Sequence, residues 1–225
     1  MSDTAKSKRI PALILYAVLF YTVWALWALV IRPPLKEAMD DSLLFELLSS
    51  CFKTLVWTVP ALLLIKAFEP EMQVGLRQMF TEKVPLKAIL LWTLIFVIFG
   101  GGTLFRGILH GTLHINPEFS LKSNQWLLIV GISEETVFRG WFLNATAKDD
   151  KDWKPIALNA VMFLCIHFPG WIQKGMLLQA FTGFGFFTIL LFSVLVSVCF
   201  LKHKNLLLPV FLHMLYDFLL EFFAA

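Results

Sequence analysis

Residues 126–147 read WLLIVGISEETVFRGWFLNATA, a run of membrane-spanning length that holds two glutamates and one arginine. A helix of roughly 20 mostly apolar residues crosses the hydrocarbon core of a bilayer. Ionisable groups inside such a helix cost about 2.5–3.5 kcal/mol each on insertion scales, and they usually mark a functional site. The run therefore predicts a membrane helix, and its charged residues predict that this helix has polar partners elsewhere in the chain.

The composition of the whole chain supports the same interpretation. Of the 225 residues, 58% are hydrophobic and only 16% are charged, and the mean hydropathy is +0.75. An ordinary soluble domain is about 45–50% apolar and about 25% charged. We therefore expect an all-α, polytopic transmembrane helix bundle that forms a single membrane domain over residues 1–225. The net charge of +3 comes from lysines scattered over the loops, so it indicates no nucleic-acid partner.

Length and apolarity together predict seven spanning helices. The first is uncharged throughout and too long for a signal-peptide core, so we expect it to be retained. The predicted spans are Ile10–Ile31, Leu43–Ile65, Ala88–Phe105, Trp126–Ala147, Pro155–Trp171, Met176–Leu201 and Leu206–Phe223.

The basic residues test this number, because cytoplasmic loops of membrane proteins carry an excess of lysine and arginine. With the amino terminus inside, twelve basic residues fall on the inner side and five on the outer side. The inner ones are Lys6, Lys8, Arg9, Lys66, Arg77, Lys83, Lys87, Lys148, Lys151, Lys154, Lys202 and Lys204, and the outer ones are Arg32, Lys36, Arg106, Lys122 and Lys174. This alternation predicts seven spans with the amino terminus inside and the carboxyl terminus outside.

The last four predicted helices hold several ionisable groups at similar depths. At about 1.5 Å per residue, Glu134, His167, His213 and Asp217 lie roughly 12–21 Å from the inner ends of their helices. The helices run in alternating directions, yet these groups fall in one layer of the membrane. A single intramembrane histidine is often only a hydrogen-bonding residue between helices, whereas the whole set in one layer predicts one polar site.

Spacing separates the roles of the two glutamates. Glu135 and Arg139 are four residues apart, so they can pair along one helix face. Glu134 points about 100° away, since each helical residue turns by that angle. We therefore expect Glu135 to pair with arginine and Glu134 to be left free, with any partner on another helix. Lys53, in the middle of the second span, is expected to pair with Glu46, with the acidic site as the alternative.

The later helices repeat the four-residue spacing. His213 and Asp217 are separated by four residues, so the aspartate can orient the imidazole. Phe163 precedes His167 by the same interval, which places an aromatic ring on the face of the histidine.

Three motifs, in chain order and on separate apolar helices, carry a family resemblance. They read Glu134-Glu135-Thr-Val-Phe-Arg139, Phe163-Leu-Cys-Ile-His167 and His213-Met-Leu-Tyr-Asp217, and the stretch Asn205-Leu-Leu-Leu-Pro209 precedes the last one. At these residues the chain resembles the CPBP family of CAAX proteases and bacteriocin-processing enzymes, also called the Abi family. The resemblance covers residues 126–222, which are predicted to form the catalytic core.

The resemblance implies an intramembrane endopeptidase similar to the type II CAAX prenyl proteases. It implies that Glu134 and His167 activate a water, and that His213 and Asp217 face the oxyanion. Glu135, Arg139 and Phe163 would then hold and tune the site from its surroundings. The implied partners are membrane lipid and a membrane-associated peptide or protein substrate, for example a lipidated or bacteriocin-like chain.

The last motif has Asp217 where the type II CAAX prenyl proteases of this family have asparagine. An asparagine donates a hydrogen bond to an oxyanion, whereas an ionised Asp217 only accepts one. Asp217 must therefore be protonated, orient His213 or ligate a metal. Two histidines with carboxylates are also a plausible zinc set. Metal-free catalysis and a Zn²⁺ site at Glu134, His167, His213 and Asp217 both remain open at the level of sequence.

Two further functional classes compete with the protease hypothesis. A non-enzymatic relative, such as a bacteriocin immunity or maturation partner, would keep the fold with a vestigial site. A small transporter would use the carboxylates as a proton relay, but the chain lacks the matched broken helices of such proteins. The complete polar set favours the enzyme, and the short, phenylalanine-rich chain favours a bacterial cytoplasmic membrane.

Overall fold

The computed structural model describes residues 8–39, 43–120 and 126–224, and these residues form a helix bundle. The first half contains α1 (Arg9–Leu26), π-helical η1 (Trp27–Ile31), α2 (Arg32–Ala38), α3 (Leu43–Lys53), π-helical η2 (Thr54–Thr58), α4 (Val59–Ala67), the 3₁₀ turn η3 (Glu69–Glu71), α5 (Leu76–Thr81), α6 (Leu86–Thr103) and α7 (Phe105–His110). The second half contains α8 (Trp126–Glu135), π-helical η4 (Thr136–Leu143), α9 (Trp153–Cys165), α10 (Phe168–Gln173), α11 (Leu177–Thr182), α12 (Gly185–His203) and α13 (Leu207–Phe222). The strands β1 (His114–Ile115) and β2 (Phe223–Ala224) form one short antiparallel pair.

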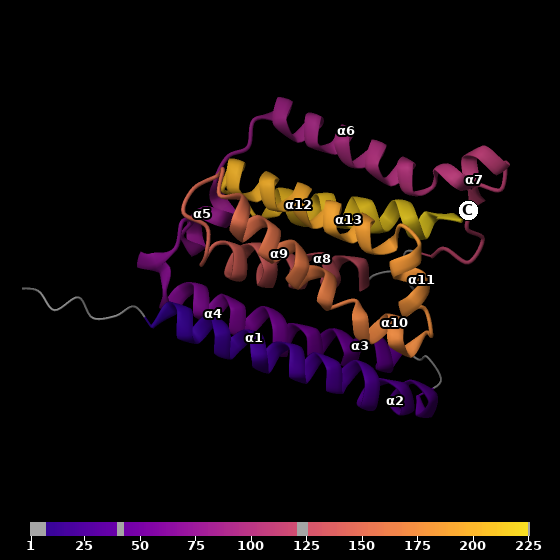
Figure 1. Cartoon of the computed structure of the whole chain (residues 1–225), viewed down its shortest axis with the longest axis horizontal. Coiled ribbons are helices and arrows are strands. Elements are labelled where there is room, and N and C mark those ends of the chain that lie inside the picture. Colours follow the sequence, from indigo (N-terminus) through magenta and orange to yellow (C-terminus); the bar gives the residue numbers. More distant parts are fainter. Residues whose placement is uncertain (1–7, 40–42, 121–125, 225) are drawn as a thin grey trace, which may run out of the picture.

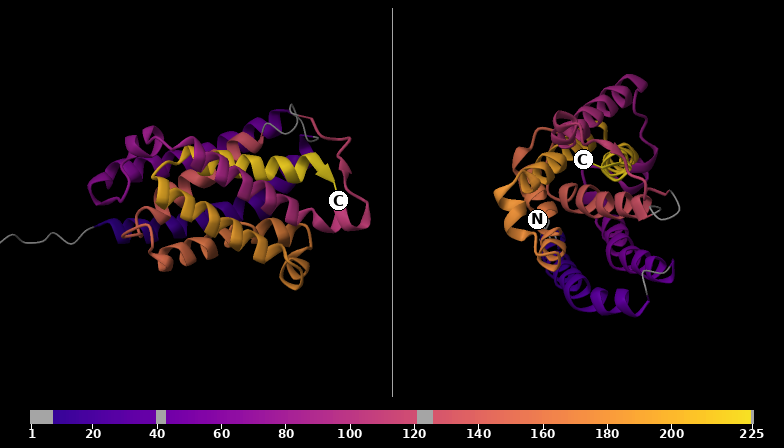
Figure 2. Two further views of the ribbon diagram at one scale, coloured as in Figure 1. Left: turned by 90° about the horizontal axis from the view of Figure 1, so that it is seen from above. Right: turned by 90° about the vertical axis from the view of Figure 1, so that its right-hand side faces the viewer.

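The helix formed by α8 and η4 lies at the centre of the bundle. It runs between the amino-terminal helices on one side and α13, α12 and α6 on the other (Figure 1), and an end-on view shows the same order (Figure 2). α8 packs against α3, η2 and α13, whereas η4 packs against α4, α9 and α12. All eight residues of η4 are buried, so every side chain on this turn of the helix faces protein.

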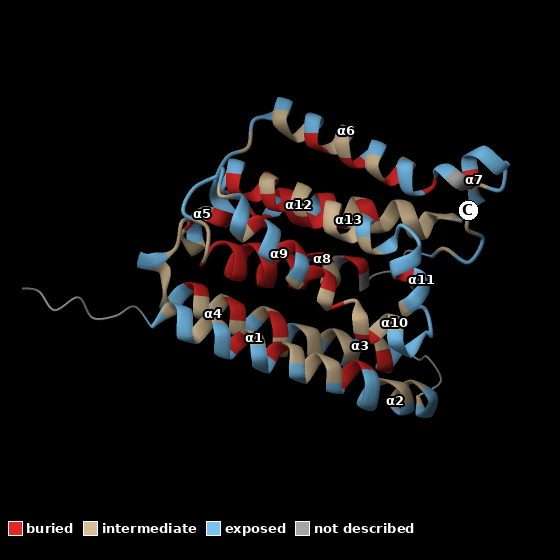
Figure 3. Ribbon diagram, in the orientation of Figure 1, coloured by how far each residue is buried: buried red, intermediate tan, exposed pale blue. Residues whose placement is uncertain are grey.

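Exposed residues follow the outer faces of α1 and α6 (Figure 3), and many of them are apolar. Leu15 is 61% exposed on α1, and Leu90 and Ile98 are 60% and 65% exposed on α6. Apolar faces of this extent are covered by lipid in a membrane protein. Five helices among the described residues are long and apolar enough to span a bilayer, so the chain is an integral membrane protein.

The seven predicted spans correspond to helices in the bundle, with corrections. The five helices that are long and apolar enough are Arg9–Ala38, Leu43–Ala67, Leu86–Thr103, Trp153–Gln173 and Gly185–His203. The predicted span at 126–147 contains three charged residues, and α13 has only 16 residues. The first is therefore too charged and the second too short to be among these five. The number seven therefore stays a prediction.

Two predicted helix boundaries are wrong. The first helix does not end at Ile31, because it continues as α2 through Pro33 and Pro34. Proline is tolerated there because it occupies the first turn of a new helical segment, where its missing N–H is not needed. The predicted span Met176–Leu201 is broken at Gly183 and Phe184, which separate α11 from α12.

The connections predicted to lie inside the cell meet at one end of the bundle. Asn144, after η4, bonds both backbone groups of Val74, at 2.9 and 2.8 Å. The backbone N–H of Leu206 donates to Met79, and the Asn205 amide donates to Glu82. The loops after α4, η4 and α12 therefore share one side, as the charge pattern predicts. Which side of the membrane this is stays a prediction, and Lys6 and Lys122 lie outside the described residues.

A glycine sets the distance between the central helix and α13. A Cβ atom added to Gly131 would lie 2.9 Å from Met214 Cγ and 3.4 Å from the carbonyl oxygen of Val210. The contact with Met214 is shorter than van der Waals contact, so any larger residue here would require α13 or the Met214 side chain to shift. This close approach brings the end of α8 against the middle of α13, where the charged residues of both helices lie.

Candidate active site

Glu135 is the last residue of α8 and is fully buried. Its Oε1 accepts hydrogen bonds from Arg139 Nη1 at 3.0 Å and from His213 Nδ1 at 2.7 Å. The predicted pair with Arg139 is confirmed. The contact with His213 joins residues 78 positions apart, so the carboxylate links α8 to α13 as well as bracing its own helix.

Arg139 extends this network to two more helices. Its Nη2 donates to the backbone oxygen of Ser193 at 3.1 Å and to the Ser193 hydroxyl at 2.8 Å. Its guanidinium carbon lies 4.7 Å from the centre of the Phe163 ring. Phe163 thus covers a buried cation, a favourable arrangement because the ring face carries partial negative charge. Arg139 fastens η4 to α12 and to α9.

His213 is held mainly by Glu135 and only weakly by Asp217. Since a carboxylate can only accept, the imidazole donates from Nδ1 to Glu135, and Nε2 points the other way. Nε2 lies 3.5 Å from Asp217 Oδ2 and 3.9 Å from Glu134 Oε2. Sequence spacing had indicated Asp217 as the orienting group, but the 2.7 Å contact with Glu135 is much shorter. Glu135 therefore fixes the ring, and Asp217 faces its open nitrogen.

Glu134 pairs with Lys53, a cation for which the sequence favoured a different partner. Its Oε1 accepts a hydrogen bond from Lys53 Nζ at 2.9 Å, and both side chains are largely buried. The expectation that Glu134 is left free is wrong, and Lys53 pairs with the acidic site, which was the alternative to the favoured partner Glu46. The prediction that the partner of Glu134 lies on another helix is confirmed. The pair joins α3 to α8 across 81 residues, a separation that no local spacing can indicate.

His167 is the N-cap residue of α10 and is the remaining member of the predicted site. Its Nδ1 lies 3.0 Å from the carbonyl oxygen of Phe163, and its ring lies 5.3 Å from the ring of that residue. The predicted contact with Phe163 is confirmed. His167, His213 and Asp217 line one cavity of about 50 Å³ together with Phe163, Ile189, Phe192 and Tyr216. A water needs roughly 10–15 Å³ and two or more polar partners, so this cavity can hold one.

Comparison with known proteins identifies the part of the chain that carries these groups. Residues 116–219 match the family model described as type II CAAX prenyl endopeptidase Rce1-like. Residues 116–219 are therefore similar to this family, and we refer to them as the Rce1-like domain. It contains every predicted site residue, and the resemblance predicted from the three motifs is confirmed. No curated protein and no solved structure matches the chain.

The geometry of the Rce1-like domain also tests the predicted zinc alternative. Zinc is bound by histidine, cysteine and carboxylate ligands at about 2.0–2.3 Å, and catalytic sites use three of them. The Nδ1 atoms of His213 and His167 donate to Glu135 and to a backbone carbonyl, which leaves the Nε2 atom of each ring as the only possible metal ligand. Within the described ranges, no three His, Cys, Asp or Glu side chains form a group that could hold a metal ion. The predicted zinc set does not fit this arrangement, and we derive no step through a metal.

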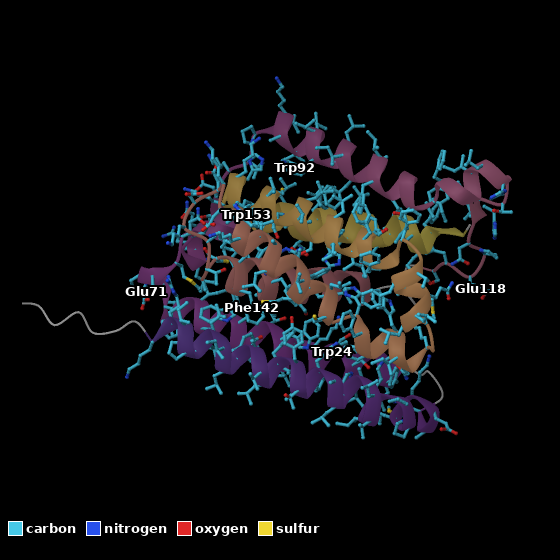
Figure 4. The ribbon with its side chains drawn as sticks, in the orientation of Figure 1. Trp24, Glu71, Trp92, Glu118, Phe142 and Trp153 are labelled. Atoms are coloured by element: carbon cyan, nitrogen blue, oxygen red, sulfur yellow. The ribbon has the colours of Figure 1, made fainter. Side chains whose placement is uncertain are left out.

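A second pocket, of about 270 Å³, lies beside the Rce1-like site. Helices α1, η1, α3, α8 and α10 form its walls. Its charged and aromatic lining consists of Trp24, Trp27, Arg32, Glu46, Lys53 and Lys174. Trp24 lies between α1 and the central helices (Figure 4) and donates from its indole to the carbonyl of Ile166 at 2.8 Å. Lys53 is common to this pocket and to the Glu134 ion pair.

Proposed function

We propose that this protein is an intramembrane endopeptidase that hydrolyses a peptide bond of a membrane-associated substrate through a water activated by Glu134 and His167. One observation carries the proposal: within an Rce1-like domain, His167, His213 and Asp217 surround a water-sized cavity, and Glu134 lies beside His213. The family supports a protease in general terms, and the residue roles are our inference.

The hydrogen bonds of the two histidines support separate roles. His167 Nδ1–H donates to the Phe163 carbonyl, so in the neutral ring Nε2 carries a lone pair that can accept from a water. Glu134 has one oxygen bound to Lys53, and its other oxygen, Oε2, lies on the His213 side. These contacts support the inference that Glu134 and His167 hold and deprotonate one water, as general bases do.

The reaction balances with these groups alone. A water proton passes to Glu134, the hydroxide oxygen bonds to the peptide carbonyl carbon, and the carbonyl electron pair moves onto oxygen. In its imidazolium form, His213 donates from Nε2 to that oxyanion while Glu135 holds Nδ1. Collapse of the intermediate breaks the C–N bond, and the proton on Glu134 passes to the leaving amine. The role of Asp217 is to position the open nitrogen of His213.

The substrate follows from the surroundings of the site. Because the site lies within the bundle, its substrate is a peptide or protein segment that enters from the membrane. A lipidated chain and a bacteriocin-like chain are both consistent with such entry, and we propose a bacterial cytoplasmic membrane as the location. The pocket beside Lys53 is lined by tryptophan rings, three cationic side chains and one carboxylate. Such a lining suits an apolar substrate segment that carries a negative group.

Substrate trapping tests the proposal. Glu134→Gln keeps the shape of the side chain and can still accept from Lys53, but it removes the base. We expect cleavage to fall about 10²–10⁴-fold, while native substrates remain bound to the purified variant and are identified by mass spectrometry. Glu37→Gln, on the exposed face of α2, is the matched control and should cleave like the wild type.

The same experiment separates the enzyme from a non-enzymatic binding partner. An immunity or maturation protein would bind its partner equally in the wild type and in Glu134→Gln, and neither would cut it. Cleavage of the trapped chain by wild-type protein in detergent, and its loss in the variant, is the result expected for the protease. Undiminished cleavage by Glu134→Gln would overturn the proposed mechanism.

A further inference from the structure

Lys53 is a buried cation contributed by a helix outside the Rce1-like domain. It is the last residue of α3, in a predicted membrane span, and its side chain is 16% exposed. A lysine at this position of a membrane helix is costly unless it is paired. Its Nζ donates to Glu134 Oε1 at 2.9 Å and lies over the Trp57 and Trp24 rings, at 4.6 and 5.6 Å from their centres.

The aromatic rings around Lys53 are themselves fixed. Trp57 is fully buried, and its backbone carbonyl accepts a hydrogen bond from Tyr16 at 3.0 Å. The Trp24 indole donates to the carbonyl of Ile166, next to His167. The position of the ammonium group is therefore determined by α1, η2 and α9 together, and not by the flexible lysine side chain alone.

A second polar contact aligns the same two helices. The hydroxyl of Thr58 donates to that of Ser133 at 3.1 Å, one residue before Glu134. Thr58 ends η2, the π-helical segment that follows directly after Lys53. π-Helical segments often occur at functional sites because they change the direction of neighbouring side chains. The two contacts fix the register of the second helix against α8 at the glutamate.

The effect of Lys53 on Glu134 is directional. It binds only Oε1, so Oε2 is left on the side of His213, 3.9 Å from its Nε2. The lysine and the histidine thus face different oxygens of the same carboxylate. Lys53 also adds a positive charge to a site that holds the carboxyl groups of Glu134, Glu135 and Asp217.

We propose that Lys53 is a positioning residue of the site, which holds Glu134 Oε1 so that Oε2 is presented to the water. This rests on the proposed function, because it assigns Glu134 as the base. It extends the functional site beyond the Rce1-like domain to the amino-terminal helices. Charge-assisted hydrogen bonds are about twice as strong as neutral ones, which makes this contact a suitable anchor.

Three substitutions test the role of Lys53, with kcat, KM and thermal stability measured in detergent on a trapped substrate. Lys53→Met removes the anchor, and we expect kcat to fall about 10- to 100-fold with KM within about twofold. Lys53→Arg keeps the charge and should recover most of the loss. The matched control is Lys66→Met, which breaks an exposed ion pair with Glu69 and should leave both constants unchanged.

Each other outcome has a defined meaning. A Lys53→Met variant with wild-type kcat would overturn the proposal, and so would a rise in KM alone, which would assign Lys53 to substrate binding in the adjacent pocket. If Lys53→Met does not fold, Lys53→Gln replaces it. Its amide can donate only an uncharged, weaker hydrogen bond to Oε1, so kcat should fall less than in Lys53→Met, and an unchanged kcat would overturn the proposal. Failure of both to fold, with full activity in Lys53→Arg, would make Lys53 purely structural. Full activity of Glu134→Gln would instead reject the proposed function itself.

Discussion

The amino-terminal helices and the Rce1-like domain contribute to the site in different ways. The domain supplies the two glutamates, Arg139 and both histidines, and nearly all of these side chains are buried. Helices α1 to α4 are mainly apolar and exposed to lipid, and the side chains that they bring to Glu134 and its neighbour Ser133 are Lys53 and Thr58. One region therefore carries the reacting groups, whereas the other sets the position of one of them.

The two adjacent glutamates show the same difference on a smaller scale. Glu135 is bound within the domain, to Arg139 and to His213. Glu134 is bound across the boundary, to Lys53. A network closed within one region resists rearrangement, whereas a pair that spans two regions depends on how they pack. Variants of Glu135, Gly131 and Asp217 should therefore differ in how strongly they affect the protein, in that order.

Removing the charge of Glu135 should have the largest effect on stability. Glu135→Gln leaves Arg139 buried without a carboxylate, and breaking a buried ion pair costs typically about 3–5 kcal/mol. Because Glu135 also holds His213, activity should fall in the variant that remains folded. Thermal unfolding and peptide cleavage of Glu135→Gln and Glu134→Gln, side by side in one detergent, are the measurements. Equal stability of the two variants would argue against the division of roles.

The packing of α8 against α13 should be nearly as sensitive. Gly131→Leu forces side-chain atoms against Met214 and the Val210 carbonyl, and overpacking of this kind costs typically about 1–3 kcal/mol. It should also separate Glu135 from His213 and lower cleavage at unchanged expression. Gly101→Leu on α6 is the matched control, because an added Cβ meets nothing within 4 Å there. Similar activities of both variants would show that this close approach does not set the site.

Much of this arrangement could be predicted from local sequence, and the reasons are physical. Contacts four residues apart follow directly from helix geometry, which is why the Glu135–Arg139 pair and the Phe163–His167 contact are confirmed. The shared layer of ionisable groups follows from the high cost of burying them singly in lipid. The resemblance to the protease family rests on the same spacings.

The contacts that could not be predicted lie between distant parts of the chain. Lys53–Glu134 and Glu135–His213 are 81 and 78 residues apart, so they depend on which helices become neighbours. Sequence spacing favoured Glu46 for Lys53 and Asp217 for His213 because both are close along the chain. The π-helical segments η1, η2 and η4 also have no simple periodic pattern, although η2 and η4 follow directly after Lys53 and Glu135.

The smallest expected effect concerns Asp217, which lies at the edge of the network. Its Oδ2 is 3.5 Å from His213 Nε2, and in our mechanism it only positions that nitrogen. Asp217→Asn keeps the size of the side chain and adds an N–H that can donate to the oxyanion. We therefore expect activity to be retained or raised, and we expect a metal chelator to leave both proteins unaffected. Glu221→Gln, one turn further along α13, is the matched control.

The opposite outcome for Asp217 would be equally clear. If Asp217 ligated zinc, Asp217→Asn would lose metal and activity together, and a chelator would inhibit the wild type. A third case is that a protonated Asp217 donates to the oxyanion and asparagine replaces it poorly. Losing one donor from an oxyanion site costs about 2.7–4 kcal/mol, or about 10²–10³ in rate, so the fall in cleavage rate would be measurable. Cleavage assays of wild type, Asp217→Asn and Glu221→Gln, with chelator and with added Zn²⁺, together with metal content by mass spectrometry, separate these cases. An active, chelator-resistant Asp217→Asn variant would show that the site tolerates a neutral side chain at its edge and would exclude the zinc alternative.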